Sequence, residues 1–120
     1  MITLKTLAQA TAQEVFDQVA KHMLKQNKRS ESSNGACKYR SDDGLKCAAG
    51  CLISDDEYIT GFDDDDETSW SDLIANYPDL VPSEHQELIV QLQIIHDFTE
   101  VNYWYDDLNR IAKSFNLKMV

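Results

Sequence analysis

The clearest structural signal in the chain is the stretch VNYWYDDLNRIAKSF, residues 101–115. Its apolar side chains recur at the i, i+3, i+4 and i+7 spacing that places them on one face of an α-helix. The members of this face are Val101, Trp104, Tyr105, Leu108, Ile111, Ala112 and Phe115. The spacing therefore predicts an amphipathic helix whose apolar face lies on a core.

A second amphipathic helix is predicted to begin near Thr11. Thr11 and Glu14 have the spacing of a capping box, in which each side chain accepts a hydrogen bond from the other residue's backbone N–H. Apolar residues at helical spacing follow on one face: Val15, Phe16, Val19, Ala20, Met23 and Leu24. Residues 27–36 lack this periodicity and are rich in loop-forming residues, so they predict a surface connection.

Two further helices are predicted in the second half of the chain. Ser69 is a candidate N-cap for a short helix that Tyr77-Pro78 would end. The next helix is predicted from Pro82 to His96, and its apolar residues form two stripes rather than one. One stripe contains Leu88, Leu92 and Ile95, and the other contains Val90 and Ile94. This helix is expected to be central in the fold or to form the contact of a homodimer.

A hairpin is predicted between Cys37 and Cys47. The short runs Cys37–Arg40 and Leu45–Cys47 flank Ser41–Gly44, whose Asp-Gly pair favours a tight turn because glycine tolerates positive φ. Residues 48–53 are expected to form a short helix in which Gly50 marks close packing of two backbone segments. The predicted fold class is α+β, mostly helical: about four helices around one core with a short two-stranded hairpin, in a single domain over residues 1–120.

Negative charge is concentrated in the middle third of the chain. The formal net charge is -10: residues 1–40 contribute +4 (seven Lys/Arg, three Asp/Glu), residues 41–80 contribute -11 (one and twelve) and residues 81–120 contribute -3 (three and six). Such a surface repels phosphate groups, so direct nucleic-acid binding and attachment to anionic membranes are disfavoured. No long apolar run and no secretory signal pattern is found, and we expect a cytoplasmic location.

Three cysteines raise the question of metal or thiol chemistry. Cys37, Cys47 and Cys51, with His22 as a fourth ligand, supply the residue types of a zinc site, but their spacing lacks the two close pairs of zinc fingers and ribbons. Free, buried thiols are therefore the preferred interpretation, in keeping with a reducing compartment. The spacing of His22, His85 and His96 pairs none of them with a cysteine, and the dipeptide His96-Asp97 is a weak signal. We predict no catalytic residue, no metal and no cofactor.

The acidic run at residues 63–67 does not match a calcium-binding loop. With Asp63 as position 1 of an EF-hand, Thr68 stands where glycine is required and Ile74 where the bidentate glutamate is required. The run is expected to be a solvated loop or a surface that faces a partner. We expect replacement of the four aspartates 63–66 by asparagine to slow association with a partner and to leave stability nearly unchanged.

Several segments of the sequence carry a resemblance to other proteins. The stretch 11–26, Cys37-Lys-Tyr-Arg40, Gly44–Ile53 and Asp56-Glu-Tyr58 are similar to a group of small uncharacterised proteins from bacteriophages and bacteria, as are Leu92–Asp97, Trp104 and Leu108. The resemblance implies a phage or prophage setting, in which small acidic proteins often inhibit host machinery. It implies no catalytic residues.

The leading functional hypothesis is an acidic protein-interaction module without enzymatic activity, and the resemblance extends it to a phage- or prophage-encoded inhibitor of a host defence protein. The alternative is a small cysteine- or metal-dependent enzyme. The predicted partner has a basic surface, because exposed carboxylates steer association while aromatic anchors supply most of the binding energy. The predicted contact residues are Asp63, Asp64, Asp65, Asp66, Glu67, Tyr58, Phe62 and Trp70.

Overall fold

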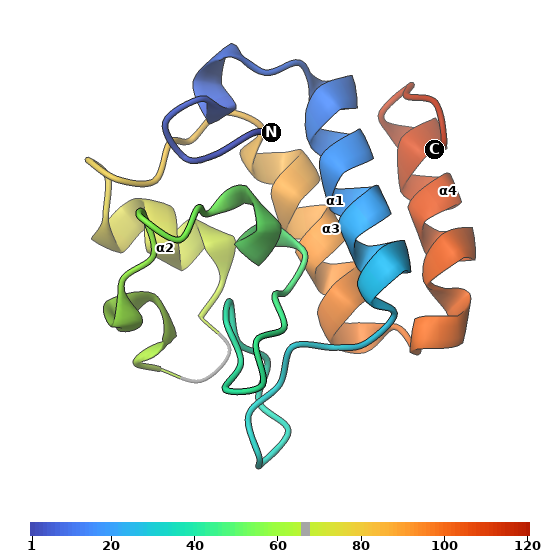
Figure 1. The fold of residues 1–120 in the computed structure, drawn as a ribbon. Helices are drawn as coiled ribbons and strands as arrows, with labels where there is room; N and C mark the ends of the chain where they lie inside the picture. Colours follow the sequence, from blue (N-terminus) through green and yellow to red (C-terminus); the bar gives the residue numbers. More distant parts are fainter. Residues whose placement is uncertain (66–67) are drawn as a thin grey trace.

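Three α-helices lie side by side in the computed structural model, which describes residues 1–65 and 68–120 (Figure 1). They are α1 (Ala12–Gln26), α3 (Gln86–Phe98) and α4 (Trp104–Ser114), and α4 runs antiparallel to the other two. A fourth helix, α2 (Trp70–Asn76), packs against α3. Short 3₁₀ helices complete the described elements: η1 (Leu7–Gln9), η2 (Ala49–Leu52), η3 (Thr60–Asp63) and η4 (Val101–Tyr103).

The N-termini of α1 and α2 are formed by the predicted capping residues. The Thr11 side chain accepts from Glu14 N at 3.1 Å, and the Glu14 carboxylate accepts from Thr11 N at 2.8 Å, which completes the capping box. At α2 the Ser69 hydroxyl accepts from Asp72 N, and the helix ends before Tyr77. Both predictions are confirmed, because the signals that set them lie within four residues of the helix end.

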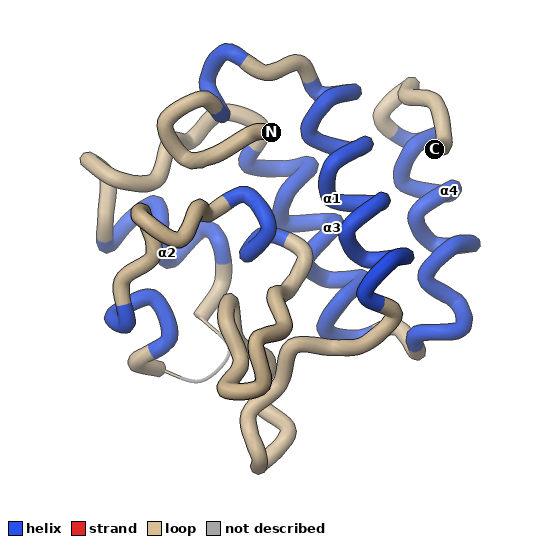
Figure 2. Tube along the Cα trace, in the orientation of Figure 1, coloured by secondary structure: helices blue, strands red, loops and turns tan. Residues whose placement is uncertain are grey.

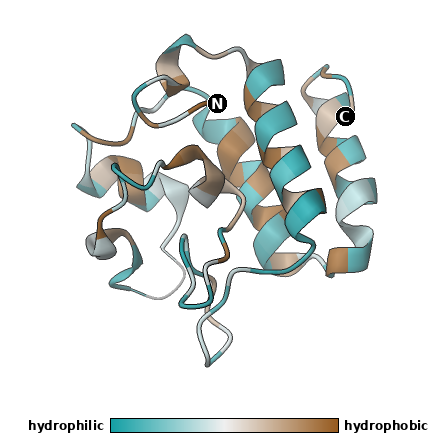
Figure 3. Cartoon of the chain, viewed as in Figure 1, coloured by the Kyte–Doolittle hydropathy of each residue, from teal (hydrophilic) through white to brown (hydrophobic). Residues whose placement is uncertain are grey.

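Helix α3 is the central element. It contacts α1, α2, α4 and η2, and its first stripe, Leu88, Leu92 and Ile95, is buried. The helix begins at Gln86 rather than at Pro82, because His85 adopts a left-handed conformation (φ 63°) immediately before it. Apolar residues concentrate along α3 and on the inner side of α1, as Figure 3 shows, so one cluster of buried side chains draws on all four helices.

The α+β prediction is wrong: the described residues contain no β-strand, and the fold is all-α (Figure 2). One isolated antiparallel bridge, Arg40 with Lys46, is what remains of the expected pairing, and a second bridge joins Glu31 to Cys37 outside the predicted hairpin. The predicted turn does form, since Gly44 N donates to Ser41 O and Ser41 N donates to Leu45 O, with Gly44 at φ 85°. The error concerns the arms of the hairpin and not its turn.

The arms do not pair further because their backbone N–H groups have partners elsewhere. Tyr39 N and Arg40 N donate to the carboxylate of Asp63, and Lys46 N donates to the side-chain oxygen of Gln26. Each of these bonds removes a donor that a strand ladder would require. Side chains that are distant in sequence therefore accept the hydrogen bonds that a neighbouring strand would otherwise accept.

None of the helices in the described part of the chain is long and apolar enough to cross a membrane.

Substitution of Gly50 by alanine is expected to destabilise the fold. A methyl group on Gly50 would lie 2.4 Å from Tyr39 O and 3.3 Å from Cys47 Sγ, so η2 would have to move away from the 37–40 segment. Overpacking of this kind costs about 1–3 kcal/mol. We expect G50A to lower the free energy of unfolding in urea by that amount.

The matched control is Gly44→Asn, because asparagine tolerates the left-handed conformation of Gly44 and no atom lies within 4 Å of the added Cβ. We expect this variant to lose less than about 1 kcal/mol. Equal stabilities of the two variants would contradict the close approach of η2 and the 37–40 segment.

Candidate functional site

Asp63, the first residue of the acidic run, is bound within the molecule. Its carboxylate accepts hydrogen bonds from Tyr39 N at 2.8 Å, Arg40 N at 3.1 Å and Tyr58 Oη at 2.6 Å. Partial burial and the bond to Asp63 raise the pKa of the Tyr58 hydroxyl above its usual range. Asp63 therefore holds the 37–40 segment against η3 and is half-buried, unlike the exposed Asp64 and Asp65.

Two of the three predicted aromatic anchors lie in the core. Phe62 and Trp70 are buried, and Phe62 makes edge-on contacts with Tyr58 and Tyr77 at ring-centroid distances of 6.0 and 5.0 Å. Tyr58 is half-buried beneath the guanidinium of Arg40, whose Cζ lies 5.0 Å from the ring centroid. In this conformation Phe62 and Trp70 are too deeply buried to serve as the main apolar anchors of a protein partner.

The remaining predicted contacts divide in two groups. Asp64 and Asp65 are exposed, as expected for a solvated or partner-facing run. Asp66 and Glu67 lie outside the described residues. Among the predicted contact residues, Asp64 and Asp65 are therefore accessible to a partner, whereas the buried anchors Phe62 and Trp70 are not.

Replacing Asp63 should affect stability in a way that replacing its neighbours does not. In Asp63→Asn the carboxylate loses its charge and one of its acceptor oxygens, and hydrogen bonds to charged groups contribute more than neutral ones. We expect D63N to lower the free energy of unfolding by about 1–2 kcal/mol. The control is the double variant Asp64→Asn, Asp65→Asn, which should stay within about 0.5 kcal/mol of wild type. If urea unfolding gave the same stability for both variants, Asp63 would not be the anchor described above.

A cysteine, a histidine and an aspartate do meet, although they are not the predicted zinc set. Ligand-type atoms of Cys37, His96 and Asp97 all lie within 4.8 Å of one another. His96 is buried, its Nδ1 lies 2.7 Å from Asp97 Oδ1, and its ring stacks on Trp104 at 5.6 Å. The sequence analysis considered the dipeptide His96-Asp97 but did not place Cys37 beside it. Cys37 lies 59 positions before His96 and reaches the cluster through the fold of the 27–40 loop.

The hydrogen bonds of His96 fix its tautomer. Ser30 N donates to Nε2 at 3.0 Å, so Nε2 must carry the lone pair and Nδ1 must carry the proton that is donated to Asp97. Both ring nitrogens are then occupied. A metal bound at Nδ1 would require the proton to be on Nε2, where it would face the N–H group of Ser30. A proton from the Cys37 thiol could not be accepted by the ring either, because neither nitrogen has a free lone pair. The arrangement is better explained as a buried hydrogen-bond network that holds the fold together than as a metal centre or a cysteine–histidine catalytic pair.

The zinc set considered from the sequence is not brought together among the described residues. Cys47 Sγ accepts from Gly50 N, the Cys51 thiol donates to Ala48 O, and His22 Nε2 lies 2.9 Å from Lys46 O. Burial raises the pKa of Cys47 well above its usual value and that of Cys51 to about 12, while burial lowers the pKa of His22. These cysteines are therefore protonated, weakly nucleophilic thiols at neutral pH.

This protonation state predicts slow thiol labelling in the native protein. In the background Cys37→Ser, we expect Cys47 and Cys51 to react far more slowly with iodoacetamide at neutral pH than a free thiol, and at the normal rate in concentrated urea. Reaction would be followed by mass spectrometry of the intact chain. Rapid modification of one native cysteine would contradict the inert-thiol description and favour the enzyme alternative.

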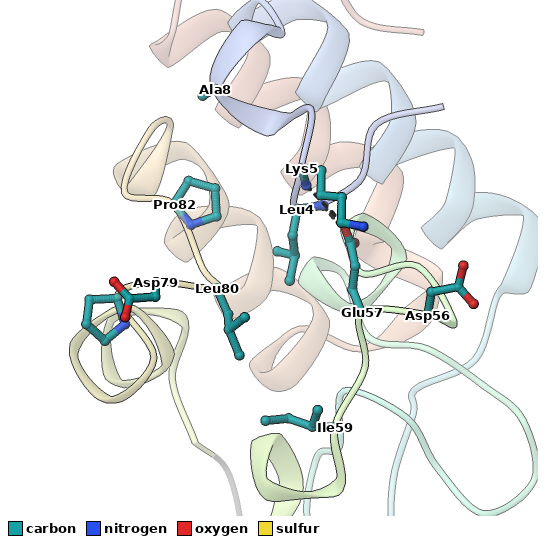
Figure 4. Close-up of a pocket in the computed structure, with 10 residues that line it drawn as sticks. Leu4, Lys5, Ala8, Asp56, Glu57, Ile59, Asp79, Leu80 and Pro82 are labelled. Atoms are coloured by element: carbon teal, nitrogen blue, oxygen red, sulfur yellow. Dashed lines mark hydrogen bonds between the residues drawn. The ribbon is translucent and has the colours of Figure 1, made fainter.

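A groove combines exposed apolar side chains with carboxylates (Figure 4). It has a volume of about 510 Å³ and lies between the N-terminal segment, residues 56–59 and the connection from α2 to α3. We call it the acidic groove, and its lining residues are Leu4, Lys5, Ala8, Asp56, Glu57, Ile59, Pro78, Asp79, Leu80 and Pro82. Its most exposed large apolar side chains are Leu80 and Ile59, at 50% and 38% of full exposure.

One wall of the acidic groove is fixed by Glu57. Its carboxylate accepts hydrogen bonds from Leu4 N, Lys5 N and Ser54 N at 2.9 to 3.0 Å, which ties the N-terminal segment to residues 54–57. Partial burial alone would raise the pKa of Glu57, but these N–H groups outweigh it and the pKa is lowered. Glu57 is therefore an ionised structural residue, and Asp56 and Asp79 remain as the exposed carboxylates of the groove.

Sequence reasoning missed most of this groove. Asp56 lies in the acidic segment on which the prediction was based, but Leu80 and Leu4 come from segments that carried no functional signal. An exposed leucine between Asp79 and Val81-Pro82 is a weak local cue, and the groove becomes visible only when three distant segments are assembled.

Comparison of the chain with protein-family models, with curated proteins and with solved structures finds no match. The functional interpretation therefore rests on the residues and their geometry.

Proposed function

We propose that this chain is a protein-interaction module that binds a basic partner segment in the acidic groove. The observation that supports this most directly is the pairing of exposed Leu80 and Ile59 with the carboxylates of Asp56 and Asp79 around one hollow. An apolar side chain of the partner would fill the hollow, and flanking lysines or arginines would lie near the carboxylates. Lys5 is the single cationic side chain of the groove.

The two kinds of residue have different parts in such binding. Exposed carboxylates speed association and disfavour acidic competitors, but each exposed ion pair contributes only about 0–1 kcal/mol. Burial of apolar surface at the centre of the contact supplies most of the affinity. The groove offers both, whereas the predicted anchors Phe62 and Trp70 are already buried by the chain's own core.

The finer hypothesis, a phage- or prophage-encoded inhibitor of a host defence protein in the host cytoplasm, is supported by the sequence resemblance alone. A small acidic module that covers a basic functional surface of its target would inhibit by occlusion, without chemistry of its own. Three cysteines without a disulfide are compatible with a reducing compartment. The enzyme alternative has less support, because His96 has no free lone pair for a thiol proton.

Selection of peptides from a random library on the immobilised chain tests the proposal and does not require the partner to be identified first. We expect the enriched peptides to combine an apolar residue with lysine or arginine, and to bind more weakly as salt is raised. Leu80→Ser should weaken their binding by about tenfold, equivalent to about 1.4 kcal/mol. Asp56→Asn with Asp79→Asn should mainly slow association.

Matched controls come from α4. Tyr105 is as exposed as Leu80, at 51%, and Asp106 is an exposed carboxylate outside the groove. Tyr105→Ser and Asp106→Asn should leave both affinity and association rate unchanged. Enriched peptides without basic residues, or equal binding to wild type and L80S, would refute the proposed contact.

A further inference from the structure

A second, smaller pocket lies between α2 and α3, on residues that the acidic groove does not use. Its volume is about 230 Å³. Trp70, Val90, Ile94 and Phe98 supply apolar and aromatic walls, and Ser69, Gln93 and Asp97 supply the polar groups. Ile94 and Phe98 are exposed at the surface of α3, while the Asp97 side chain is 19% exposed.

The carboxylate of Asp97 is held in place by two buried neighbours. Its Oδ1 accepts from His96 Nδ1 and from Gln93 Nε2, both at 2.7 Å. Each neighbour is fixed in turn, because Ser30 N donates to His96 Nε2 and Ala49 N donates to Gln93 Oε1 at 2.9 Å. The orientation of the carboxylate is thus set before any ligand arrives.

This carboxylate lacks a cationic partner among the described residues. No lysine or arginine of the described chain lies within 4.0 Å of Asp97, and the tautomer of His96 makes both of its donors neutral. Arg29 is close in the fold, but its guanidinium donates to the carbonyl oxygens of His96 and Thr99. A largely buried charge without a counterion, beside an apolar pocket, favours a ligand that brings a cation.

We propose that this pocket binds a primary alkylammonium group, supplied by a free amine or by a lysine side chain. The carbon stem would lie against Val90 and Ile94, and the ammonium group would donate to Asp97. An ammonium group fits better than a guanidinium, because bidentate binding needs both carboxylate oxygens and Oδ1 already accepts two hydrogen bonds. The proposal goes beyond the acidic groove and uses different residues.

A titration of the ¹⁵N-labelled protein followed by NMR tests this binding. The indole N–H of Trp70 is buried without a hydrogen-bond partner in the described chain, so its signal reports on the pocket. The indole of Trp104, which donates to Thr99 O, is an internal control outside the pocket lining. We expect n-butylammonium to shift the Trp70 signal and leave that of Trp104 in place.

The neutral probe 1-butanol separates charge recognition from apolar filling. We expect n-butylammonium to bind about tenfold more tightly than 1-butanol, equivalent to about 1.4 kcal/mol. Asp97→Asn retains the Oδ1 acceptor and should abolish this preference. Should D97N fail to fold, the two probes on wild type still decide, since added salt should weaken only the ammonium. Equal binding of both probes, no shift at Trp70, or a preference that survives in folded D97N would overturn the proposal.

Nα-acetyl-lysine methylamide distinguishes the two sources of the ammonium group. Affinity equal to that of n-butylammonium would show that a lysine side chain on a peptide reaches Asp97. Much weaker binding, with n-butylammonium unaffected, would assign the pocket to free amines.

Discussion

The imidazole of His96 is the contact on which the arrangement of the chain depends. It accepts a hydrogen bond from Ser30 N, donates one to Asp97 and stacks on Trp104, so it joins the 27–40 loop, α3 and α4 at one buried point. Arg29 adds hydrogen bonds to the carbonyl oxygens of His96 and Thr99 at the end of α3. Buried hydrogen bonds of this kind are costly to leave without one partner, which fixes one position for the loop relative to the helices.

The irregular middle of the chain is organised by side chains rather than by a sheet. Backbone N–H groups between Tyr39 and Ala49 find acceptors on Asp63, Gln26 and Gln93. Farther along, Glu57 does the same for the N-terminal segment. Almost every buried N–H must have an acceptor, and side chains from the helices and from the turn at Glu57 meet that requirement here.

The sequence separation between the residues of a contact decides which features could be predicted from the sequence. The caps at Thr11 and Ser69 and the apolar face around Leu108 depend on residues within a few positions, and they were predicted correctly except that Tyr105 of this face is exposed. The hairpin arms were predicted wrongly because the competitor for Tyr39 N, Asp63, lies 24 positions away. The aromatic anchors illustrate the same limit: Phe62 and Trp70 look alike in sequence whether they face a partner or the core, and burial is decided by the assembled helices. A cluster such as Cys37, His96 and Asp97 likewise has no local signature.

Dependence on distant side chains also has a consequence for the order in which structure is lost. The described residues between α1 and α2 form no α-helix, and the hydrogen bonds of this middle segment require Gln26, Gln93 and His96 to be in place on α1 and α3. It is therefore expected to open at a lower free energy than the three packed helices, as a separate cooperative unit in native-state hydrogen exchange. One wall of the acidic groove belongs to this unit, so a bound partner would protect amides far from its own contact by holding the unit closed.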